Sequence, residues 1–368
     1  MNPRSLYLHV PFCSRKCGYC AFHSVTGASS GATAAIVNRM LRDMDELAAS
    51  MPTLETLYVG GGTPTTLAPE ELSRLLTRPR DAGARPSEIT VEANPESTRP
   101  PVIRALERAG VTRLSLGVQS LEPRALHALG RVPTSLEQIA RVRDRWPGIL
   151  SVDLIHAAPG STPAGFLGAL RSLIELGVDH LSVYGLSVEP ETPLARTVSA
   201  GRLALPDAHD WPQVVETLGS AGFRRYEVSN FARPGAECRH NMTYWNAEPY
   251  LGIGPSAVST LHHNGTAVRY TQPADHTRYL RRPSVFHCAR ESLSPAQTRT
   301  EGIMLAMRRP EGITRSRLTA GRTPEETSHL QAAITRLAGE GLLELTADQI
   351  KPTNRGLDLL DQILPHLI

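Results

Sequence analysis

The stretch that decides the fold is LYLHVPFCSRKCGYCAF, residues 6–22. It begins with an alternating run, Leu6–Val10, which predicts a β-strand. Three of the five cysteines follow directly, at Cys13, Cys17 and Cys20, in a C-x3-C-x2-C spacing. An odd number of cysteines, with three crowded into one loop, is a poor disulfide framework and favours a metal or cluster site. The sequence therefore predicts a strand that delivers three thiolates to one loop.

The cysteine loop favours iron–sulfur chemistry. Three thiolates on one loop can each bind a different iron of a four-iron cluster, because thiolate is the soft ligand that such clusters select. A four-iron cluster normally takes four cysteines, so one iron would stay open here. The alternative is a zinc site completed by Cys238 or His23. Zinc loops usually combine two pairs of cysteines, and a second pair is missing, so we expect the cluster.

Outward from this loop, strand-like and helix-like runs alternate up to residue 185. We expect strands at 6–10, 56–59, 89–93, 113–117, 150–155 and 180–185. Between them we expect helices at 32–49, 70–76, 101–109, 136–145 and 163–176. Helices that stop at glycine before a β-rich run are typical of βα units on a parallel sheet. The pattern predicts an α/β fold, a partial (β/α)6 barrel, with its chemistry at the carboxyl ends of the strands.

The rhythm ends after Gly185, and two further parts follow. Residues 186–290 are rich in Pro, Gly, His and aromatic residues, with a helix expected at 211–220 and a strand at 223–229. Beyond them we expect helices at 297–307, 324–338 and 353–364, and strands at 342–345 and 350–351, an α+β, winged-helix-like pattern. The predicted domains are a core barrel, a connecting segment and a C-terminal domain, at residues 1–235, 236–293 and 294–368.

Length, composition and charge limit the function further. A chain of 368 residues exceeds the usual size of one domain, which agrees with a barrel and an appended module. The net charge of +3 comes without a clustered basic stripe, so we expect no nucleic-acid binding. The N-terminus does not resemble a signal peptide, and no run of 18 apolar residues predicts a transmembrane segment. We expect a cytoplasmic protein.

Polar residues and glycines stand where the predicted strands end. The turn Gly60–Thr63 follows the second strand, and glycines let the backbone approach a ligand closely. Glu92 ends the third strand, where a carboxylate can accept hydrogen bonds from ribose hydroxyls or simply face solvent. Gln119 follows the fourth strand. Asp153 lies inside an apolar strand and needs a partner, either Arg131 or a ligand hydroxyl, because an unpaired buried charge is costly.

The cysteine loop resembles the signature of the radical S-adenosylmethionine (SAM) superfamily. Within it, the chain is similar to the HemN-like proteins through motifs that occur in the same order: LYLHVPFCSRKCGYCAF, GGGTPT, EANPES, RLSLGVQS, LGR, DLIHAAPG, YGLSVEPETPLAR and HNMTYWNAEPYLGIG. The match covers nearly the whole chain and implies a HemN-type C-terminal domain. In this superfamily the open iron binds the amino and carboxylate groups of SAM, and an electron from the cluster cleaves SAM to a 5′-deoxyadenosyl radical.

The resemblance implies roles for particular residues. Cys13, Cys17 and Cys20 would hold a 4Fe–4S cluster. The residues implied to line SAM are Tyr7, Tyr19, Gly61, Gly62, Thr63, Glu92, Gln119, Arg131 and Asp153. Lys16, inside the loop, either moderates the negative charge of the cluster or is a solvated surface lysine.

Two functions of different classes remain open, and the resemblance favours one. One branch of the family consists of haem chaperones, which bind haem and transfer it to acceptor proteins; the other is the oxygen-independent coproporphyrinogen III dehydrogenase. The dehydrogenase carries a further cysteine where this chain has Phe22, and an extension before the first strand. Both departures favour the chaperone. A radical SAM enzyme acting on another tetrapyrrole is a third possibility, and any radical chemistry would need an electron donor of the flavodoxin or ferredoxin type.

Haem binding is assigned to the stretch CRHNMTYW. His240 is a feasible axial ligand, since imidazole is the commonest protein ligand of haem iron, and Tyr244 and Trp245 can flank the macrocycle. The alternative is a structural histidine beside aromatic residues. Cys238 is a second possible ligand or a small buried residue.

The chain departs from the family pattern at two positions near these motifs. Val258 stands where relatives usually have a histidine, so any role of that histidine is absent or moves to His262 or His263. Ala21 replaces an acidic residue common after the third cysteine. The first departure concerns how haem is held, and neither concerns the cluster.

Overall fold

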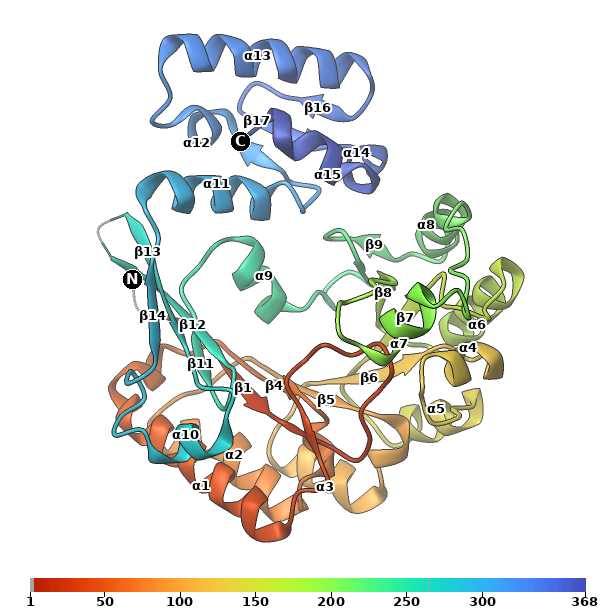
Figure 1. The fold of residues 1–368 in the computed structure, drawn as a ribbon, viewed down its shortest axis with the longest axis vertical. Coiled ribbons are helices and arrows are strands. Elements are labelled where there is room, and N and C mark those ends of the chain that lie inside the picture. The colour runs from red at the N-terminus through yellow and green to blue at the C-terminus, as the bar shows by residue number, and fades with distance from the viewer. Residues whose placement is uncertain (1–2, 264) are drawn as a thin grey trace.

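The computed structural model describes residues 3–263 and 265–368, and a curved nine-stranded sheet forms its centre (Figure 1). Its strands are, in spatial order, β11 (Leu251–Ile253), β1 (Ser5–Val10), β4 (Thr56–Gly61), β5 (Glu88–Ala93), β6 (Arg113–Gln119), β7 (Ile149–His156), β8 (His180–Gly185), β10 (Asn230–Ala232) and β9 (Arg224–Arg225). The pairs from β11 to β8 are parallel, and β10 and β9 are antiparallel. Six parallel strands lie side by side in the order of the chain: β1, β4, β5, β6, β7 and β8. The predicted partial (β/α)6 barrel is therefore confirmed.

Helices after the parallel strands cover the outer face of this sheet: α1 (Ser30–Glu46), α2 (Pro69–Asp81), α3 (Pro100–Arg108), α4 (Pro123–Ala128), α5 (Leu136–Arg143) and α6 (Pro163–Glu175). Their ends follow ordinary capping rules. Pro163 occupies the first turn of α6, and the Thr162 hydroxyl accepts the Gly165 N–H at 3.0 Å. After α3, Gly110 has φ 73°, a conformation in which glycine stops a helix without strain.

The parallel strands alternate between an apolar outer face and a polar inner face. The outer set packs against the helices in one core that includes Leu6, Leu8, Val10, Leu57, Val59, Ile89, Val91, Leu114, Leu116, Val152, Leu181 and Val183. The inner set makes side-chain hydrogen bonds between strands, such as Tyr58 to Glu92 and Ser115 to Asp153. Parallel strands covered on both faces usually read as continuous apolar runs. The alternation therefore leaves a polar inner face, called the lumen face below.

The expected connecting segment 236–293 is part of the barrel core. It forms α9 (Arg239–Trp245), β11 and α10 (His276–Arg281), and a second sheet of β12 (Val258–His263), β13 (Thr266–Thr271) and β14 (Ala289–Ser292). Leu251 and Ile253 of β11 pack in the same core as β1, as do Tyr279 and Val285. The segment thus extends the main sheet by one parallel strand and does not merely connect two domains.

The C-terminal part has a core of its own and is α+β, as predicted. Its elements are α11 (Pro295–Ala306), β15 (Ile313–Thr314), α12 (Arg315–Thr319), α13 (Pro324–Gly339), β16 (Leu343–Leu345), β17 (Gln349–Pro352), α14 (Asn354–Asp358) and α15 (Leu360–Ile363). The three strands form a small sheet in the order β15-β17-β16. Its apolar side chains, among them Ile303, Leu330 and Ile334, make a cluster separate from that of the barrel.

Two predicted elements are wrong, one at the edge of the main sheet and one in the C-terminal part. Residues 223–229 were expected to be one strand, yet β9 and β10 form a hairpin, because the Glu227 side chain accepts the Ser229 N–H at 3.0 Å and closes a turn between them. The helix expected at 353–364 breaks at Leu359 (φ −109°, ψ 21°) into α14 and α15.

Short elements complete the fold. They are β2 (Phe12–Cys13) paired with β3 (Val25–Thr26), helices α7 (Pro193–Ser199) and α8 (Trp211–Ser220), and 3-10 turns at Ala48–Thr53, Pro64–Thr66, Pro95–Ser97 and Leu364–His366. Helix α8 has the predicted bounds. Across residues 3–263 and 265–368, none of the helices combines the length and apolarity that a bilayer crossing requires.

Candidate functional site

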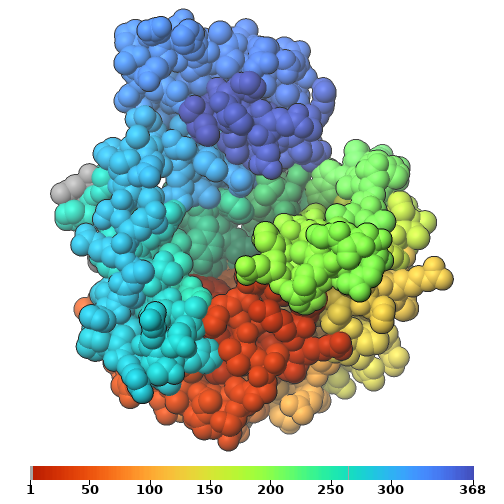
Figure 2. All heavy atoms as spheres, in the orientation of Figure 1, coloured from red at the N-terminus to blue at the C-terminus, as the bar shows by residue number. Residues whose placement is uncertain are grey.

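The cysteine loop lies over the carboxyl ends of the parallel strands, as predicted for a (β/α) barrel. Its position is fixed by two neighbours: the Gly18 N–H donates to the Leu129 carbonyl at 2.9 Å, and the Leu194 N–H donates to the Gly18 carbonyl at 2.8 Å. In Figure 1 the red loop accordingly adjoins α7. Figure 2 shows that the surface is hollowed where this red loop, the bright green segment after β8 and the blue C-terminal part come together.

The three loop thiols are unpaired and lie close enough to affect one another. Burial raises the pKa of Cys20, and the neighbouring Cys17 and Cys13 raise it further, while Lys16 lowers it. Among the described residues, no three His, Cys, Asp or Glu side chains converge as they would around a single metal ion. A four-iron cluster instead takes three cysteine sulfurs, each on a different iron, and three free thiols on one loop match that donor set.

Two hydrogen-bond donors from outside the cysteine loop face its sulfurs: Thr63 follows β4, and Arg131 lies between α4 and α5. The Thr63 hydroxyl donates to Cys13 Sγ at 3.8 Å, and Arg131 Nη1 donates to Cys17 Sγ at 3.5 Å. Thiolates of iron–sulfur clusters carry negative charge that such donors stabilise. The site therefore places two hydrogen-bond donors at the sulfurs that would hold a cluster.

Tyr19 is held inside the barrel mouth beside the third cysteine. Its ring packs against a small apolar cluster that includes Leu129 and Ile155. Burial raises the pKa of its hydroxyl, so the ring stays neutral. The aromatic residue before the third cysteine thus packs against apolar residues at the strand ends.

The glycine turn after β4 is required by close packing. A Cβ atom on Gly61 would lie 2.6 Å from the His9 ring, and its φ of 108° is a conformation that favours glycine. A Cβ on Gly62 would lie 2.5 Å from the Phe12 carbonyl oxygen. The backbone here packs so closely against β1 and β2 that neither position can carry a side chain.

Glu92 is held at the lumen face by two donors. Its carboxylate accepts the Tyr58 hydroxyl at 2.8 Å and the Gly61 N–H at 3.0 Å. Burial, reinforced by the charge of Asp153, raises the pKa of Glu92 to about 7. The carboxyl therefore changes protonation near neutral pH, and it points inward rather than to solvent.

Asp153 has partners other than those expected. Its carboxylate accepts the Ser115 hydroxyl at 3.2 Å and is also hydrogen-bonded by Ser182, whereas Arg131 acts on it only through its charge. Burial raises the pKa of Asp153 to about 6. The seryl hydroxyls satisfy the buried acid, so its partner does not have to be Arg131 or a ligand.

Gln119 ends β6, and Tyr7 lies in the middle of β1. Gln119 has φ 69°, uncommon for a residue other than glycine, and sits at a bulge in the pairing of β6 with β7. The Tyr7 hydroxyl is hydrogen-bonded to His9 Nδ1 at 3.0 Å, and His9 Nε2 to the His23 carbonyl at 2.9 Å. His9 thereby ties a predicted site tyrosine to the segment after the third cysteine.

The predicted haem residues are not brought together with the cysteine loop. His240, on α9, lies at the amino ends of β1 and β4, the opposite end of the strands. It is 1% exposed, with Nδ1 hydrogen-bonded to the Thr56 hydroxyl and Nε2 to the Tyr244 hydroxyl, each at 2.8 Å. Burial lowers the pKa of His240 to about 3, so the ring is neutral. Trp245 is half-buried at the end of the same helix.

Glu88 fastens α9 to the barrel. Its carboxylate accepts the N–H groups of Arg239 at 3.0 Å and His240 at 2.9 Å, and it pairs with the buried Arg113 at 3.3 Å. The Cys238 thiol donates to it at 3.5 Å, which accounts for that buried cysteine without a ligand role. At the other end of the helix, Arg309 of the C-terminal part binds the Asn246 side chain.

Two site residues escaped sequence reasoning, Tyr58 and Asn94. Tyr58 alternates with apolar residues in β4, and that alternation was the available signal for a lumen position. Asn94 follows Glu92 at the end of β5 and connects Thr63 with Arg131 through its side-chain amide. Val258, which stands where relatives usually have a histidine, begins β12, and His262 and His263 end that strand.

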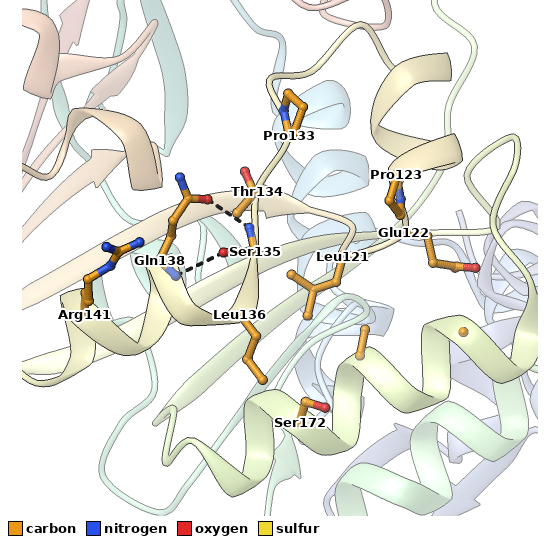
Figure 3. A pocket seen from close by; sticks show the side chains of 12 residues that line it. Leu121, Glu122, Pro123, Pro133, Thr134, Ser135, Leu136, Gln138, Arg141 and Ser172 are labelled. Atoms are coloured by element: carbon orange, nitrogen blue, oxygen red, sulfur yellow. Dashed lines mark hydrogen bonds between the residues drawn. The ribbon is translucent and has the colours of Figure 1, made fainter.

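A separate groove lies on the outer surface of the barrel. It has a volume of about 720 Å³ and runs between α4, α5 and α6 (Figure 3). Leu121, Pro133 and Leu136 give it an apolar lining, and Arg141 borders it. It contains none of the predicted site residues.

Comparisons with known proteins show the family of this chain and its fold. The family model of the radical SAM superfamily matches residues 7–173. The heme chaperone HemW of Mycobacterium tuberculosis is 37% identical over 100% of this chain and 95% of its own length, and HemW of Bacillus subtilis is 30% identical over 96% of each chain. Among solved structures, coproporphyrinogen III oxidase (HemN) from Escherichia coli, a radical SAM enzyme, has a TM-score of 0.80 at 22% identity and covers 100% of this chain and 90% of its own. The likeness to HemN shows the fold alone.

Proposed function

Since the chain belongs to the HemW family of radical SAM proteins, we propose that it is a haem chaperone, which binds haem and transfers it to acceptor proteins. The observation that carries this proposal is the extent of the similarity to relatives with that name. It covers the barrel, α9 and the C-terminal part. The radical SAM core alone would be compatible with many reactions.

The radical SAM family implies SAM and a 4Fe–4S cluster, and we assign the cluster to Cys13, Cys17 and Cys20. When bound, the reduced cluster supplies the electron for cleavage of SAM. The assignment is supported by the three mutually close thiols and by the donors Thr63 and Arg131 at two of them. The residues that we propose to line SAM are Tyr7, Tyr19, Gly61, Gly62, Thr63, Glu92, Gln119, Arg131 and Asp153.

Glu92 is the clearest of the proposed SAM contacts. Tyr58 and the Gly61 N–H fix its carboxylate before any ligand arrives, so little further ordering is needed on binding. A carboxylate in this position can accept hydrogen bonds from two ribose hydroxyls. Because the pKa of Glu92 is raised to about 7, we expect SAM to bind more tightly above that pH than below it.

For haem we propose His240, Tyr244 and Trp245, and ligation by His240 then requires α9 to move. Both ring nitrogens already have hydrogen-bond partners, and each such bond contributes on the order of 1 kcal/mol. The helix is also held by Glu88 at one end and by Arg309 at the other. Haem uptake would therefore be coupled to release of this helix.

Phe22 supports the chaperone over the dehydrogenase. It occupies the position at which the dehydrogenase has its further cysteine, and it is 71% exposed beside the cysteine loop. A phenyl ring cannot supply a thiol. It offers apolar surface, which suits contact with a haem face or with a partner protein.

Haem titration of the anaerobically reconstituted protein tests this proposal, with a coproporphyrinogen III assay in parallel. We expect stoichiometric haem binding and no decarboxylation. His240→Ala should weaken haem binding or shift the Soret band while leaving the cluster absorbance intact, with His209→Ala as an exposed control. Decarboxylation by the wild-type protein would instead identify a dehydrogenase, and absence of haem binding would exclude the chaperone.

The partners follow from the same proposal. We propose haem-acceptor proteins as recipients and a flavodoxin or ferredoxin as electron donor, since the cluster must be reduced before it can act. We also propose a cytoplasmic location, because three of the five free cysteines are taken by the cluster and none forms a disulfide among the described residues.

A further inference from the structure

Asn94, at the end of β5, stands between the two side chains that donate hydrogen bonds to the loop cysteines. We propose that Asn94 is a positioning residue: its amide orients Thr63 toward Cys13 and Arg131 toward Cys17, and so raises the reduction potential of the cluster. This inference rests on the proposed cluster site at the three cysteines. Nothing in the sequence motifs or the relatives assigns a role to this residue.

The orientation of the amide is fixed by Arg131. Arg131 Nη2 lies 3.0 Å from Asn94 Oδ1, and a guanidinium can only donate hydrogen bonds. The oxygen of the amide must therefore face Arg131, and the NH2 group must face the other way. The same guanidinium is bound by the Gly117 carbonyl, which leaves Nη1 directed at Cys17 Sγ.

The amide in turn fixes the hydroxyl of Thr63. Asn94 Nδ2 lies 3.1 Å from Thr63 Oγ1, and since Nδ2 can only donate, the hydroxyl oxygen accepts. A hydroxyl has a single hydrogen, which is then free for Cys13 Sγ at 3.8 Å. Thr63 is buried, so water does not compete for this hydrogen. Donor and acceptor roles thus run in one direction from Arg131 through Asn94 and Thr63 to Cys13.

The backbone of Asn94 is rigid enough to hold this arrangement. Its N–H donates to Ser97 Oγ at 3.1 Å, and the Ser97 hydroxyl donates to the Asn94 carbonyl at 2.8 Å. Ser97 also lies 2.6 Å from the Thr65 hydroxyl, in the turn that follows the glycines. The ends of β4 and β5 are therefore linked on both sides of the amide.

The consequence concerns the electron that the cluster accepts. Reduction adds negative charge to the cluster, and donors at its sulfurs stabilise the reduced state more than the oxidised state, which raises the potential. Both donors reach cysteine sulfurs, and both contact the same amide. Asn94 can therefore influence two of the three ligands without touching the cluster.

Potentiometric titration of the reconstituted protein, without SAM and followed by EPR of the reduced cluster, tests this inference. Asn94→Asp keeps the acceptor for Arg131 but replaces the NH2 donor with an oxygen, so the Thr63 hydroxyl turns toward Asp and away from Cys13. Thr63→Val removes the hydroxyl without adding charge. We expect each variant to lower the equilibrium constant for reduction about tenfold, which is about 59 mV for one electron.

The controls separate two effects of Asn94→Asp on the potential, the loss of the Thr63 hydrogen bond and the added negative charge. In a Thr63→Val background, Asn94→Asp should shift the potential less than in the wild type, because no hydroxyl remains to turn. Thr63→Ser should restore the wild-type potential, and Asn38→Asp, the same change on the exposed face of α1, should leave it unmoved.

Each outcome decides the inference. Equal shifts by Asn94→Asp in both backgrounds, or a wild-type potential in Thr63→Val, would overturn it. If Asn94→Asp fails to hold the cluster, Asn94→Ala replaces it, because it removes both hydrogen bonds without adding charge. It should lower the potential, and a wild-type potential in Asn94→Ala would overturn the inference. Failure of the wild-type protein to take up iron would overturn the cluster site itself, and absence of haem binding would leave the potentials, and this inference, unaffected.

Discussion

Glu92 brings a pH dependence into the stability of the barrel. Its pKa is held at about 7 in the folded chain, above its ordinary 4.5. Below pH 4.5 the carboxyl is protonated in both states. Between these two values the unfolded chain releases a proton that the folded chain retains, so the free energy of unfolding falls as pH rises through this window. The loss is complete above about pH 7.

We therefore expect Glu92→Gln to flatten this dependence. The variant has no carboxyl proton to release at this position. The difference in free energy of unfolding between wild type and variant should therefore change by up to about 3 kcal/mol between pH 4.5 and about 7. Urea unfolding of the cluster-free protein across this range measures it. Glu96→Gln, a change at an exposed carboxyl nearby, is the matched control. Parallel curves for wild type and Glu92→Gln would contradict the prediction.

The cysteine assignment leads to a prediction for each thiol. Cys13→Ser, Cys17→Ser and Cys20→Ser should each abolish a stable cluster, because each sulfur binds a different iron. Cys238→Ser should retain it, since that thiol is buried against Glu88 at the other end of the strands. Iron and sulfide analysis after anaerobic reconstitution measures both. Stoichiometric zinc and no iron in the wild-type protein would refute the assignment.

For single residues, sequence patterns indicate the binding side chains better than they indicate the residues that position those side chains. The cysteine spacing and a carboxylate at a strand end are local, so Cys13 and Glu92 could be singled out. The role of Asn94 depends on Arg131, which is 37 positions away in the chain and meets it only after folding. The surroundings of His240 likewise come from Thr56, on a distant strand.

Among the elements, the end of β4 requires a glycine at position 61. Gly61→Ala adds a Cβ that meets the His9 ring, at a φ that side chains avoid, so we expect a loss of about 1–3 kcal/mol in the free energy of unfolding. SAM should also perturb the spectrum of the reduced cluster less than in the wild type. Chemical unfolding and anaerobic spectroscopy measure the two effects.

Gly168→Ala is the matched control, and its expected effect has the opposite sign. Gly168 lies on the exposed face of α6, where an added Cβ meets no atom within 4 Å. Alanine in the interior of a helix is favoured over glycine by about 1 kcal/mol, so this variant should be more stable than the wild type. If both substitutions changed the free energy of unfolding equally, the close contact and positive φ at Gly61 would not be the reason that this position requires glycine.

Elements with a regular pattern were predictable, and those set by remote contacts were not. The six parallel strands and α8 follow from apolar alternation and helical spacing. Strand β11 has three residues, one of them glycine, and is a strand because β1 lies beside it. The turn at Glu227 depends on a side-chain hydrogen bond that a β-rich pattern conceals.

For the whole molecule, Asp358 is one of the polar links between the C-terminal part and the barrel. One carboxylate oxygen accepts hydrogen bonds from Trp211 Nε1 at 2.8 Å and Arg225 Nη1 at 2.7 Å. Asp358→Ala should remove both and loosen the docking, with faster hydrogen exchange in β9 and α14. The small sheet β15-β17-β16 should keep its protection, because that part has its own core. Asp361→Ala, at a side chain 95% exposed, is the matched control. Unchanged exchange in Asp358→Ala would place the docking energy elsewhere.

The alternation of the barrel strands also safeguards the fidelity of folding. In β4, Leu57 and Val59 face the helices, while Thr56 and Tyr58 face the lumen. A shift of one position in the pairing of such a strand would turn every side chain to the wrong face. Apolar groups would lose their core, and polar groups would be buried among leucines without partners, at a cost of about 1–3 kcal/mol each. A misaligned strand thus loses free energy on both faces at once. The polar interior that a ligand needs therefore also favours the correct register of the strands.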